Sequence, residues 1–573
     1  MKHLLPYFKK YKWLSILAPA FKMLEACFDL TVPLIVAGII DKGITANDKS
    51  YIISRFLLLI LMALLGLLSS FTAQFFAAKA AIGTATGLRH DLIKKIQSLS
   101  LTETDRIGKS TLITRLTSDI NLVQNGLNIF LRLFMRSPFI VLGATVLAFT
   151  VNAELALIFV GVIIVLFVIV FSIMHITKPL HKNVQQSLDA VTAITKENLS
   201  GVRVIRAFSR QEKQKEKFAS TNANLLRAQL RVGSISAVLN PLTYVTVNIA
   251  TVLVLWLGAD KADTGAVLSG DIVALINYIG QILVELVKLA TLITLIARSI
   301  ASMGRVGQVL DTESSMNYGS VTQAPDTDSA VTFKNVSLTY QGAGAPSVSE
   351  LSFEVKRGET VGIIGGTGSG KTTLAHLITR FYDATEGEVE LFGESIKNWD
   401  REALRKRVCI VPQKPLLFYG TVRSNLLWGN GKADDKALWD ALGRAQAKSF
   451  VEAKEKGLDE RVEQGGANFS GGQKQRLTIA RAFLSGADIL ILDDSSSALD
   501  FATDAALRKA VRSLPGNVTT FIISQRTSSI AHADRILVLE DGCLVGTGTH
   551  NELLENCDTY REIHESQFKK EAE

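Results

Sequence analysis

Long apolar runs dominate the first 300 residues of the chain. Six of them approach or exceed the roughly 18–20 residues that a helix needs to cross a bilayer, and they cover 13–40, 56–78, 129–150, 155–176, 238–257 and 272–296. Such runs predict six membrane-spanning helices. Because six is an even number, the N-terminus and everything after residue 300 are expected on the same side of the membrane.

The basic residues predict which side that is. Lysine and arginine gather before the first run and in two long segments, 79–126 and 177–234, whereas the alternate connections hold only Lys42, Lys49 and Lys261. Cytosolic loops of membrane proteins collect lysine and arginine, so the N-terminus, both long segments and the C-terminal half are expected in the cytosol. The first run is not followed by a small-residue cleavage site, which argues against a signal peptide.

The two long basic segments are themselves patterned. Apolar residues recur at helical spacing over 88–99, 112–123 and 188–208. A structureless loop of this length would be unusual. We therefore expect these segments to be cytosolic extensions of the membrane helices, joined in pairs by short turns.

The pattern changes after residue 311. Residues 312–329 are polar, which predicts a linker between a membrane domain (1–311) and a soluble domain (330–573). In the soluble part, 331–340, 351–355 and 360–364 are strand candidates. Three further candidates are apolar on both faces, as a buried parallel sheet requires, and they cover 489–492, 519–523 and 535–540.

Composition agrees with a membrane protein. Of 573 residues, 47% are hydrophobic and 20% are charged, which excludes a disordered chain. The four cysteines are scattered without a C-x-x-C pair, so neither a disulfide framework nor a zinc site is indicated. The net charge of +8 fits basic cytosolic loops better than a nucleic-acid partner.

A glycine-rich loop follows the strand expected at 360–364. Residues 365–372 fit the pattern G-x4-G-K-[ST], and a helical pattern follows. Glycines let backbone N–H groups turn toward an anion, and a helix N-terminus adds favourable potential. Lys371 is expected to contact the β- and γ-phosphates and Thr372 to bind Mg²⁺. The expected nucleotide-binding residues of this loop are Gly366, Thr367, Gly368, Ser369, Gly370, Lys371, Thr372 and Thr373.

A second element of such a site is Asp493. It follows the apolar strand expected at 489–492, and ligands of α/β sheets bind at the carboxyl ends of the strands. Asp493 is therefore expected in the Mg²⁺ shell. Together with the glycine-rich loop it predicts binding of ATP with Mg²⁺.

The third element is the sequence Asn-Phe-Ser-Gly-Gly-Gln-Lys-Gln-Arg at 468–476. Here the chain resembles the ABC transporter family, whose signature loop is Ser-Gly-Gly-Gln. The resemblance covers the whole chain and implies an exporter half-transporter: an α-helical membrane domain of six transmembrane helices with long cytosolic extensions, followed by an α/β P-loop nucleotide-binding domain. It also implies that the signature residues contact ATP, namely Ser470, Gly471, Gly472 and Gln473.

Other family motifs match in order. The resemblance implies that Tyr340 stacks on adenine and that Gln413 contacts the metal and senses the γ-phosphate, so that Thr372, Gln413 and Asp493 form the metal set. Residues 497–500 match the D-loop, and 197–208 resemble the second intracellular coupling segment. The turns near 105–110 and 200–202 would dock on nucleotide-binding domains.

Two catalytic positions depart from the family pattern. Where competent sites have a glutamate that orients the attacking water, this chain has Asp494. Its carboxylate is one methylene shorter, and a misplacement of about 1 Å can cost roughly 10²-fold in rate. Where the family has a histidine at the γ-phosphate, this chain has Gln525, which donates a hydrogen bond but carries no charge.

The altered pair resembles the degenerate-site subunit of bacterial heterodimeric multidrug exporters. This resemblance implies a multi-pass plasma-membrane subunit that exports amphiphilic drugs or lipids. Its own ATP site would hydrolyse poorly, and its signature loop would complete the competent site of a second half-transporter. Two alternatives remain open: a homodimeric exporter with slow hydrolysis, and a non-transporting regulatory membrane subunit gated by ATP.

Candidate residues for the cargo site come from charges within the membrane spans. Ionisable residues inside membrane spans are functional candidates, which here are Glu25, Asp29 and Glu285. Acidic side chains facing a cavity would suit cationic amphiphiles, but structural pairing is an equal alternative, for example between Glu285 and Lys288. Pro241 predicts a kink in the fifth span.

Overall fold

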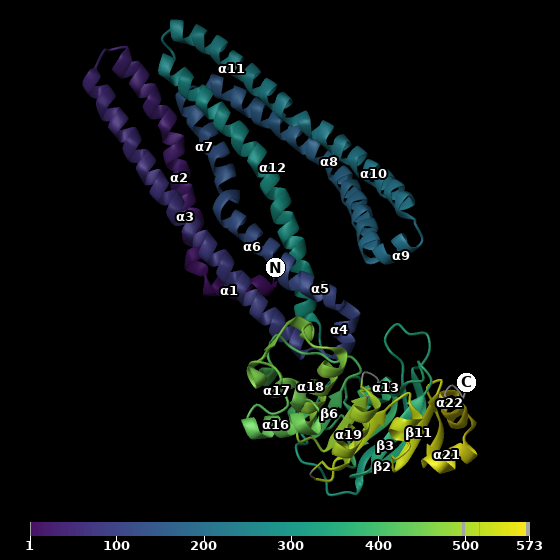
Figure 1. The fold of residues 1–573 in the computed structure, drawn as a ribbon. Coiled ribbons are helices and arrows are strands. Elements are labelled where there is room, and N and C mark those ends of the chain that lie inside the picture. Colours follow the sequence, from purple (N-terminus) through teal and green to yellow (C-terminus); the bar gives the residue numbers. More distant parts are fainter. Residues whose placement is uncertain (1, 496–498, 515, 569–573) are drawn as a thin grey trace. The chain divides into compact units, whose positions relative to one another are not determined.

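The computed structural model describes residues 2–495, 499–514 and 516–568, and the chain divides into two compact units (Figure 1). Unit 1 consists of Met1–Gln97 and Ser110–Asp311, and unit 2 of Ser98–Lys109 and Thr312–Glu573.

Unit 1 is entirely helical. Six helical stretches are long and apolar enough to cross a membrane, which confirms the six expected spans. They are Lys12–Ile44, Lys49–Ser98, Lys109–Val151, Ala153–Ser200, Gln211–Asp263 and Ser269–Asp311. The helices of this unit are α1 (Leu5–Lys10), α2 (Lys12–Gly38), α3 (Lys49–Ser98), α5 (Lys109–Thr114), α6 (Ile120–Ile129), α7 (Arg136–Val151), α8 (Ala153–Ser200), α9 (Val202–Ala207), α10 (Gln211–Ala237), α11 (Leu239–Asp263) and α12 (Ser269–Asp311).

The long helices run past the apolar spans, as the sequence pattern predicts. Helix α8 packs along α10 and α11, and α12 packs against α2, α6 and α7. The short helix α9 joins α8 to α10 at the far end of their extensions (Figure 1). The kink expected at Pro241 lies slightly earlier, where Val238 separates α10 from α11. Proline has no N–H for the carbonyl of Ala237, so the regular helix cannot continue through this point.

Several membrane helices contain wider π-type turns. These turns cover Ile39–Ile44, Arg115–Asp119 and Phe130–Phe134. Only Met135 separates the last one from Arg136, the first residue of α7. Such turns frequently occur at functional sites because they redirect the side chains around them.

Unit 2 is built on a six-stranded sheet with the order β12-β11-β3-β10-β9-β6. All neighbours pair in parallel except β12, which is antiparallel to β11. A second, antiparallel sheet has the order β2-β1-β4-β5, and a small third one pairs β7 with β8. The strands are β1 (Ser329–Leu338), β2 (Val348–Lys356), β3 (Thr360–Gly365), β4 (Glu386–Leu391), β5 (Glu394–Ser395), β6 (Val408–Val411), β7 (Gly420–Thr421), β8 (Arg461–Val462), β9 (Ile489–Asp493), β10 (Thr519–Ile523), β11 (Arg535–Glu540) and β12 (Cys543–Gly548).

All six expected strands are present. The central ones are buried along their length, β9 at every position, because neighbours on both sides and helices on both faces exclude water from a parallel sheet. The helices of unit 2 are α4 (Leu101–Ile107), α13 (Lys371–Ile378), α14 (Arg401–Arg407), α15 (Val422–Leu426), α16 (Asp435–Arg444), α17 (Lys448–Glu452), α18 (Gly471–Phe483), α19 (Phe501–Arg512), α20 (Thr527–Ile530), α21 (His550–Asn556) and α22 (Asp558–Phe568).

Unit 2 includes two segments that the sequence pattern does not assign to the soluble domain, the expected linker and helix α4. The residues expected as a linker are held by backbone bonds, such as the one from the N–H of Gly319 to the carbonyl of Trp399 at 3.1 Å. Helix α4, which lies within the long cytosolic segment between α3 and α5, also belongs to unit 2.

Candidate functional site

The glycine-rich loop connects β3 to α13, as its sequence context predicts. Gly368 and Gly370 have φ of 89° and 93°, a left-handed conformation that glycine adopts without strain. A Cβ on Gly370 would also lie only 2.5 Å from Val348. The loop therefore requires glycine for both backbone shape and space.

Lys371 is the first residue of α13, and its side chain turns back over the loop. Its Nζ donates to the carbonyls of Gly365 at 2.9 Å and Gly366 at 2.6 Å, and the residue is only 9% exposed. Burial lowers the pKa of Lys371, an effect that the carboxylates of Asp494 and Asp493 oppose. A cation in this position can neutralise phosphate charge from inside the loop.

Thr372 and Asp493 meet where α13 begins and β9 ends. The Thr372 hydroxyl donates to the Asp493 carboxylate at 3.1 Å. Burial, with the charge of Asp494 adding to it, raises the pKa of Asp493. A hydroxyl and a carboxylate facing one another are hard oxygen donors of the kind that Mg²⁺ takes, so the residues present fit that ion.

A pocket of about 240 Å³ opens over these groups. It gathers candidate residues from four separate segments of the sequence. Its lining comprises Ser347, Thr367, Gly368, Ser369, Gly370, Lys371, Thr372, Thr373, Gln413, Asp493, Asp494, Ile523, Ser524 and Gln525. The expected phosphate, metal and catalytic positions therefore lie together in one hollow.

The two altered catalytic residues both face this pocket. Asp494 has φ of 44°, a left-handed conformation that aspartate tolerates better than most residues. Its carboxylate accepts a hydrogen bond from Gln413 Nε2 at 3.1 Å. The exposed Gln525 follows β10, and its backbone carbonyl accepts from Gln567 at 2.7 Å. Neither position brings a histidine or a longer carboxylate to the pocket.

Tyr340 lies beside the pocket and is not among the residues that line it. Its hydroxyl lies 3.3 Å from both Thr373 Oγ1 and His376 Nδ1 on α13. Its ring meets that of Tyr382 edge-on, at 4.9 Å between centroids. The ring is thus anchored at the helix that carries the glycine-rich loop.

The signature residues lie apart from this pocket, at the N-terminus of α18. Ser470 caps the helix, accepting from Gln473 N at 3.3 Å, while the Gln473 side chain accepts from Ser470 N at 3.0 Å. Ser470 and Gly471 are exposed. Phe469, where the family usually has leucine, is buried and packs edge-on against Phe450. The loop thus ends in an exposed helix N-terminus suited to an anion.

Part of the D-loop match lies outside the described residues, namely Ser497 and Ala498. Asp500 is described and caps α19, with its carboxylate accepting from Thr503 N at 2.8 Å.

Two acidic side chains of α4 form hydrogen bonds with the rest of unit 2. Asp105 accepts a hydrogen bond from the hydroxyl of Tyr382. Glu103 accepts from the backbone N–H of Ser315 at 3.2 Å and belongs to the capping box of Ser100. Burial alone would raise the pKa of Glu103, but hydrogen bonds from Ser100 and Ser315 outweigh it and hold the pKa below its ordinary value.

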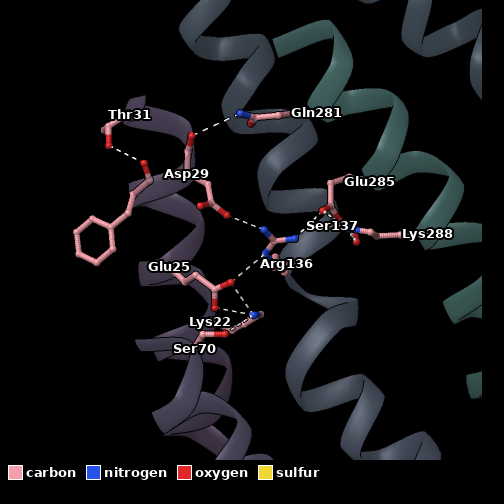
Figure 2. A network of polar contacts seen from close by, with 11 residues as sticks. Lys22, Glu25, Asp29, Thr31, Ser70, Arg136, Ser137, Gln281, Glu285 and Lys288 are labelled. Carbon is pink, nitrogen blue, oxygen red and sulfur yellow. Dashed lines mark hydrogen bonds and ion pairs between the residues drawn. The ribbon is translucent and has the colours of Figure 1, made fainter. Parts of the chain in front are cut away.

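The three acidic candidates in the membrane helices share one partner, Arg136 (Figure 2). Its guanidinium lies 2.7 Å from Asp29, 2.6 Å from Glu285 and 4.0 Å from Glu25. Lys288 pairs with Glu285 at 3.2 Å, as expected from their spacing, and Lys22 pairs with Glu25 at 2.5 Å. We call these six charged residues the membrane ion network, and its charges balance.

Helix α2 contains Pro33, one turn after Asp29 of this network. Pro33 has no N–H for the carbonyl of Asp29, and Gln281 Nε2 approaches that carbonyl at 3.5 Å. The hydroxyl of Tyr278 donates to the next carbonyl, that of Leu30, at 2.7 Å. Gln281 of α12 thus approaches the carbonyl that Pro33 leaves without its helical donor, and Tyr278 of α12 adds a hydrogen bond to the next one.

Comparisons with known proteins cover both halves of the chain. The ABC transporter transmembrane region matches residues 15–286, and the ABC transporter domain matches residues 348–497. An uncharacterized ABC transporter ATP-binding protein of Bacillus subtilis, YfiB, is 34% identical over 100% of this chain and 99% of its own length. The chain belongs to the ABC transporter family.

More distant relatives of this ABC transporter extend the comparison. An ATP-dependent lipid A-core flippase of Vibrio vulnificus is 28% identical over 99% of this chain and 97% of its own. The structure of a bacterial Atm1-family ABC exporter with ATP bound superposes with a TM-score of 0.81, at 23% identity, over 98% of both chains. The transporter thus has the exporter-type fold, an ABC ATPase domain and a multi-pass membrane domain.

Sequence reasoning missed two members of the membrane ion network. Lys22 and Arg136 lie inside predicted spans but are not among the candidates named from the sequence. The signal that could have found them was present: a buried cation in a membrane span requires a partner, and three unassigned acids were available.

Proposed function

We propose that this ABC transporter is a subunit of a bacterial plasma-membrane exporter that uses ATP to move amphiphilic compounds, drugs or lipids, out of the cytosol. Its N-terminus and nucleotide-binding domain are cytosolic. The exporter-type fold and the flippase relatives support this proposal, as does the concentration of lysine and arginine in the segments assigned to the cytosol.

The nucleotide site has a defined set of roles in this proposal. The loop from Gly366 to Thr373 holds the phosphates, with Lys371 as the cation, and Tyr340 supports the adenine. Mg²⁺, held by Thr372 and Asp493 with Gln413 nearby, supplies charge neutralisation at the phosphates. The contact of 3.1 Å between Thr372 and Asp493 supports this assignment.

The site binds ATP well and hydrolyses it slowly. A base that orients water must reach it, and the short Asp494 carboxylate is instead engaged by Gln413 at 3.1 Å. Gln525 is neutral where a positive charge would stabilise the transition state. This pair of residues in one pocket is the observation that carries the proposal of an impaired site.

The signature loop serves a different site, in a second half-transporter with a competent centre. Ser470 and Gly471 are exposed and do not line the pocket of their own chain. The tip formed by α9 and its flanks is also exposed and apolar, with Leu199 and Phe208 each 72% accessible and Val204 61%. Apolar side chains in a cytosolic turn favour a protein partner, which supports assembly of two subunits.

The membrane ion network is the proposed place for the charged head of the cargo. Asp29 is its accessible acid, with 46% of its side chain exposed, whereas Glu285 is 5% exposed. Asp29 is therefore the residue that a cationic amphiphile would contact, while Glu285 and Arg136 hold the helices. Arg136 is shared, so a bound cation would compete with it for Asp29.

The decisive experiment compares the purified chain alone with the chain co-purified with a candidate half-transporter. ATP binding, ATP hydrolysis and export of ethidium or a fluorescent phospholipid from vesicles are measured for each. We expect the chain alone to bind ATP and hydrolyse it slowly, and the pair to hydrolyse and export. Vigorous hydrolysis with export by the chain alone would establish a homodimeric exporter. ATP binding without export in any combination would favour a regulatory subunit.

A further inference from the structure

A small groove between α8 and α10 carries an unusual set of side chains. Its volume is about 160 Å³, and it is lined by Leu180 and Asn183 of α8 and by Asn224, Arg227, Ala228 and Arg231 of α10. We call it the α8–α10 groove. It contains two guanidinium groups and two carboxamides, which together are good donors to a phosphate.

The cations of this groove are not neutralised locally. Residues 155–188 and 217–259, which include both walls, contain no aspartate or glutamate. Within the described chain Arg227 donates to Asn224 Oδ1 at 2.6 Å and to the carbonyl of Ala223 at 3.4 Å, both neutral acceptors. Among the described residues, Arg231 forms no salt bridge with an acidic side chain. Two positive charges therefore face the groove without a counter-charge from its walls.

The position of the groove along α8 corresponds to the cytosolic surface of the membrane. Leu180 lies 27 residues after Ala153, the first residue of α8, which is about 40 Å along a helix. A bilayer with its headgroup layers is roughly 40–45 Å thick. The apolar run of α8 ends near Ile176, and Lys178 and Lys182 flank Leu180 in the sequence.

We propose that the α8–α10 groove binds the phosphate of an anionic phospholipid from the cytosolic leaflet. Arg227 and Arg231 provide the charge, and Asn183 and Asn224 provide neutral donors that a phosphate ester can use. Leu180 and Ala228 give the groove apolar walls, which suit the glycerol and the start of the acyl chains. The site is separate from the ATP pocket and from the membrane ion network.

Geometry distinguishes this groove from ordinary arginines near a membrane. Arg227 and Arg231 are one helical turn apart on the same face of α10, and Asn224 lies on that face one turn earlier. Asn224 holds the Arg227 guanidinium in place. Two guanidinium groups on one face, one of them held in place, suit a phosphate group better than a diffuse negative surface.

The test measures lipid binding to the whole protein, by native mass spectrometry or in nanodiscs, with phosphatidylglycerol and with phosphatidylcholine of the same acyl chains. The variant replaces both groove arginines, Arg227→Gln with Arg231→Gln. The matched control, Lys213→Gln with Lys215→Gln, removes two cations from the other end of the same helix. A third variant, with both arginines changed to lysine, keeps the charge.

We expect the glutamine variant to bind phosphatidylglycerol roughly 30-fold more weakly, since each surface cation contributes about a fivefold gain in affinity for anionic lipid. Phosphatidylcholine has no net charge, so its weak binding should not change, and the control should match the unaltered protein. The lysine variant should recover only part of the affinity, because lysine keeps the charge but not the planar donors of arginine. Unaltered phosphatidylglycerol binding in the glutamine variant, with its melting temperature preserved, would overturn the proposal.

Inorganic phosphate provides a separate arm. If millimolar phosphate displaces phosphatidylglycerol and binds with an affinity of its own that the glutamine variant loses, the groove takes a free anion and the lipid proposal is wrong. If phosphate does not compete, the acyl chains contribute and a membrane lipid is the ligand. Because the measurement uses no ATP, its outcome is independent of the proposed export function.

Discussion

Two residues of the ATP pocket depart from the pattern expected of a competent ABC ATPase: Asp494 stands in place of a glutamate and Gln525 in place of a histidine. The Asp494 carboxylate accepts a hydrogen bond from Gln413 at 3.1 Å. In the proposed function this carboxylate ends short of the position from which it would orient the attacking water. The expected Mg²⁺ residues and the glycine-rich loop from Thr367 to Thr373 line the same hollow. Binding and hydrolysis can therefore be separated at individual residues.

Restoring both catalytic residues should restore hydrolysis. Asp494→Glu extends the carboxylate by about 1 Å, and Gln525→His supplies a group that can be charged, so the double variant should hydrolyse ATP roughly 10²-fold faster. The rate is measured by phosphate release from the purified chain, or from an assembly whose partner lacks its own catalytic glutamate. Asp494→Asn with Gln525→His is the matched control, and it should stay slow. An unchanged rate in the restored variant would mean that the defect lies elsewhere.

Ion pairs connect three membrane helices to one another. Arg136 joins Asp29 of α2 to Glu285 of α12 from the first residue of α7 (Figure 2). Breaking a buried ion pair on one side leaves an uncompensated charge, which is far more costly than never having had the pair.

Removing Arg136 should therefore destabilise the membrane domain. Arg136→Met leaves Glu285 buried with only the exposed Lys288 nearby, at an expected cost of about 3 kcal/mol. Melting temperatures in nanodiscs should fall, and adding Glu285→Gln should recover much of the loss. Lys261→Met, which breaks the exposed pair with Glu154, should cost less than about 1 kcal/mol. If the Arg136 and Lys261 variants melt alike, the network does not stabilise the helices.

Helix α4 belongs to unit 2, although it lies between two helices of unit 1 in the sequence. It is continuous in sequence with α3 and α5, and its Asp105 accepts from Tyr382, whose ring packs on Tyr340. Within unit 2, Tyr382 thus contacts both Tyr340, the ring expected at adenine, and Asp105 of α4, in the segment between two membrane helices.

Tyr382→Phe should uncouple ATP hydrolysis from export without affecting nucleotide affinity. The variant keeps the ring contact with Tyr340 and removes the hydrogen bond to a carboxylate, which contributes about 1.5–3 kcal/mol. ATP binding and basal hydrolysis are expected to stay within about twofold, and the export of ethidium per ATP to fall about tenfold. Tyr560→Phe, which removes a hydroxyl that contacts His550, is the control. Equal export per ATP in both variants would argue against this coupling role.

The sequence predicts the helices and strands of this protein better than the contacts between them. The six spans and the six strands followed from apolar runs, because burial in lipid or in a parallel sheet leaves a pattern in the residues themselves. Arg136 could not be assigned to Asp29 and Glu285, since their contacts join helices more than 100 residues apart. The membership of α4 in unit 2 depends on side-chain contacts such as Tyr382 with Asp105, for which periodicity carries no signal.

At the scale of the whole assembly, Ser470 should act on a site that its own chain does not contain. In an assembly with a competent partner, Ser470→Ala should slow hydrolysis at least tenfold, as expected when one donor to a γ-phosphate is removed (about 1.5–3 kcal/mol). The substitution also removes a helix cap, a loss of about 1 kcal/mol. Asp434→Ala removes the equivalent cap of α16, which accepts from Ala437 N, and controls for that effect. Both variants are compared by phosphate release at saturating ATP and by melting temperature. Equal rates for the two would show that the serine only caps its helix, whereas a selective loss in the Ser470 variant would establish that the subunits share their ATP sites.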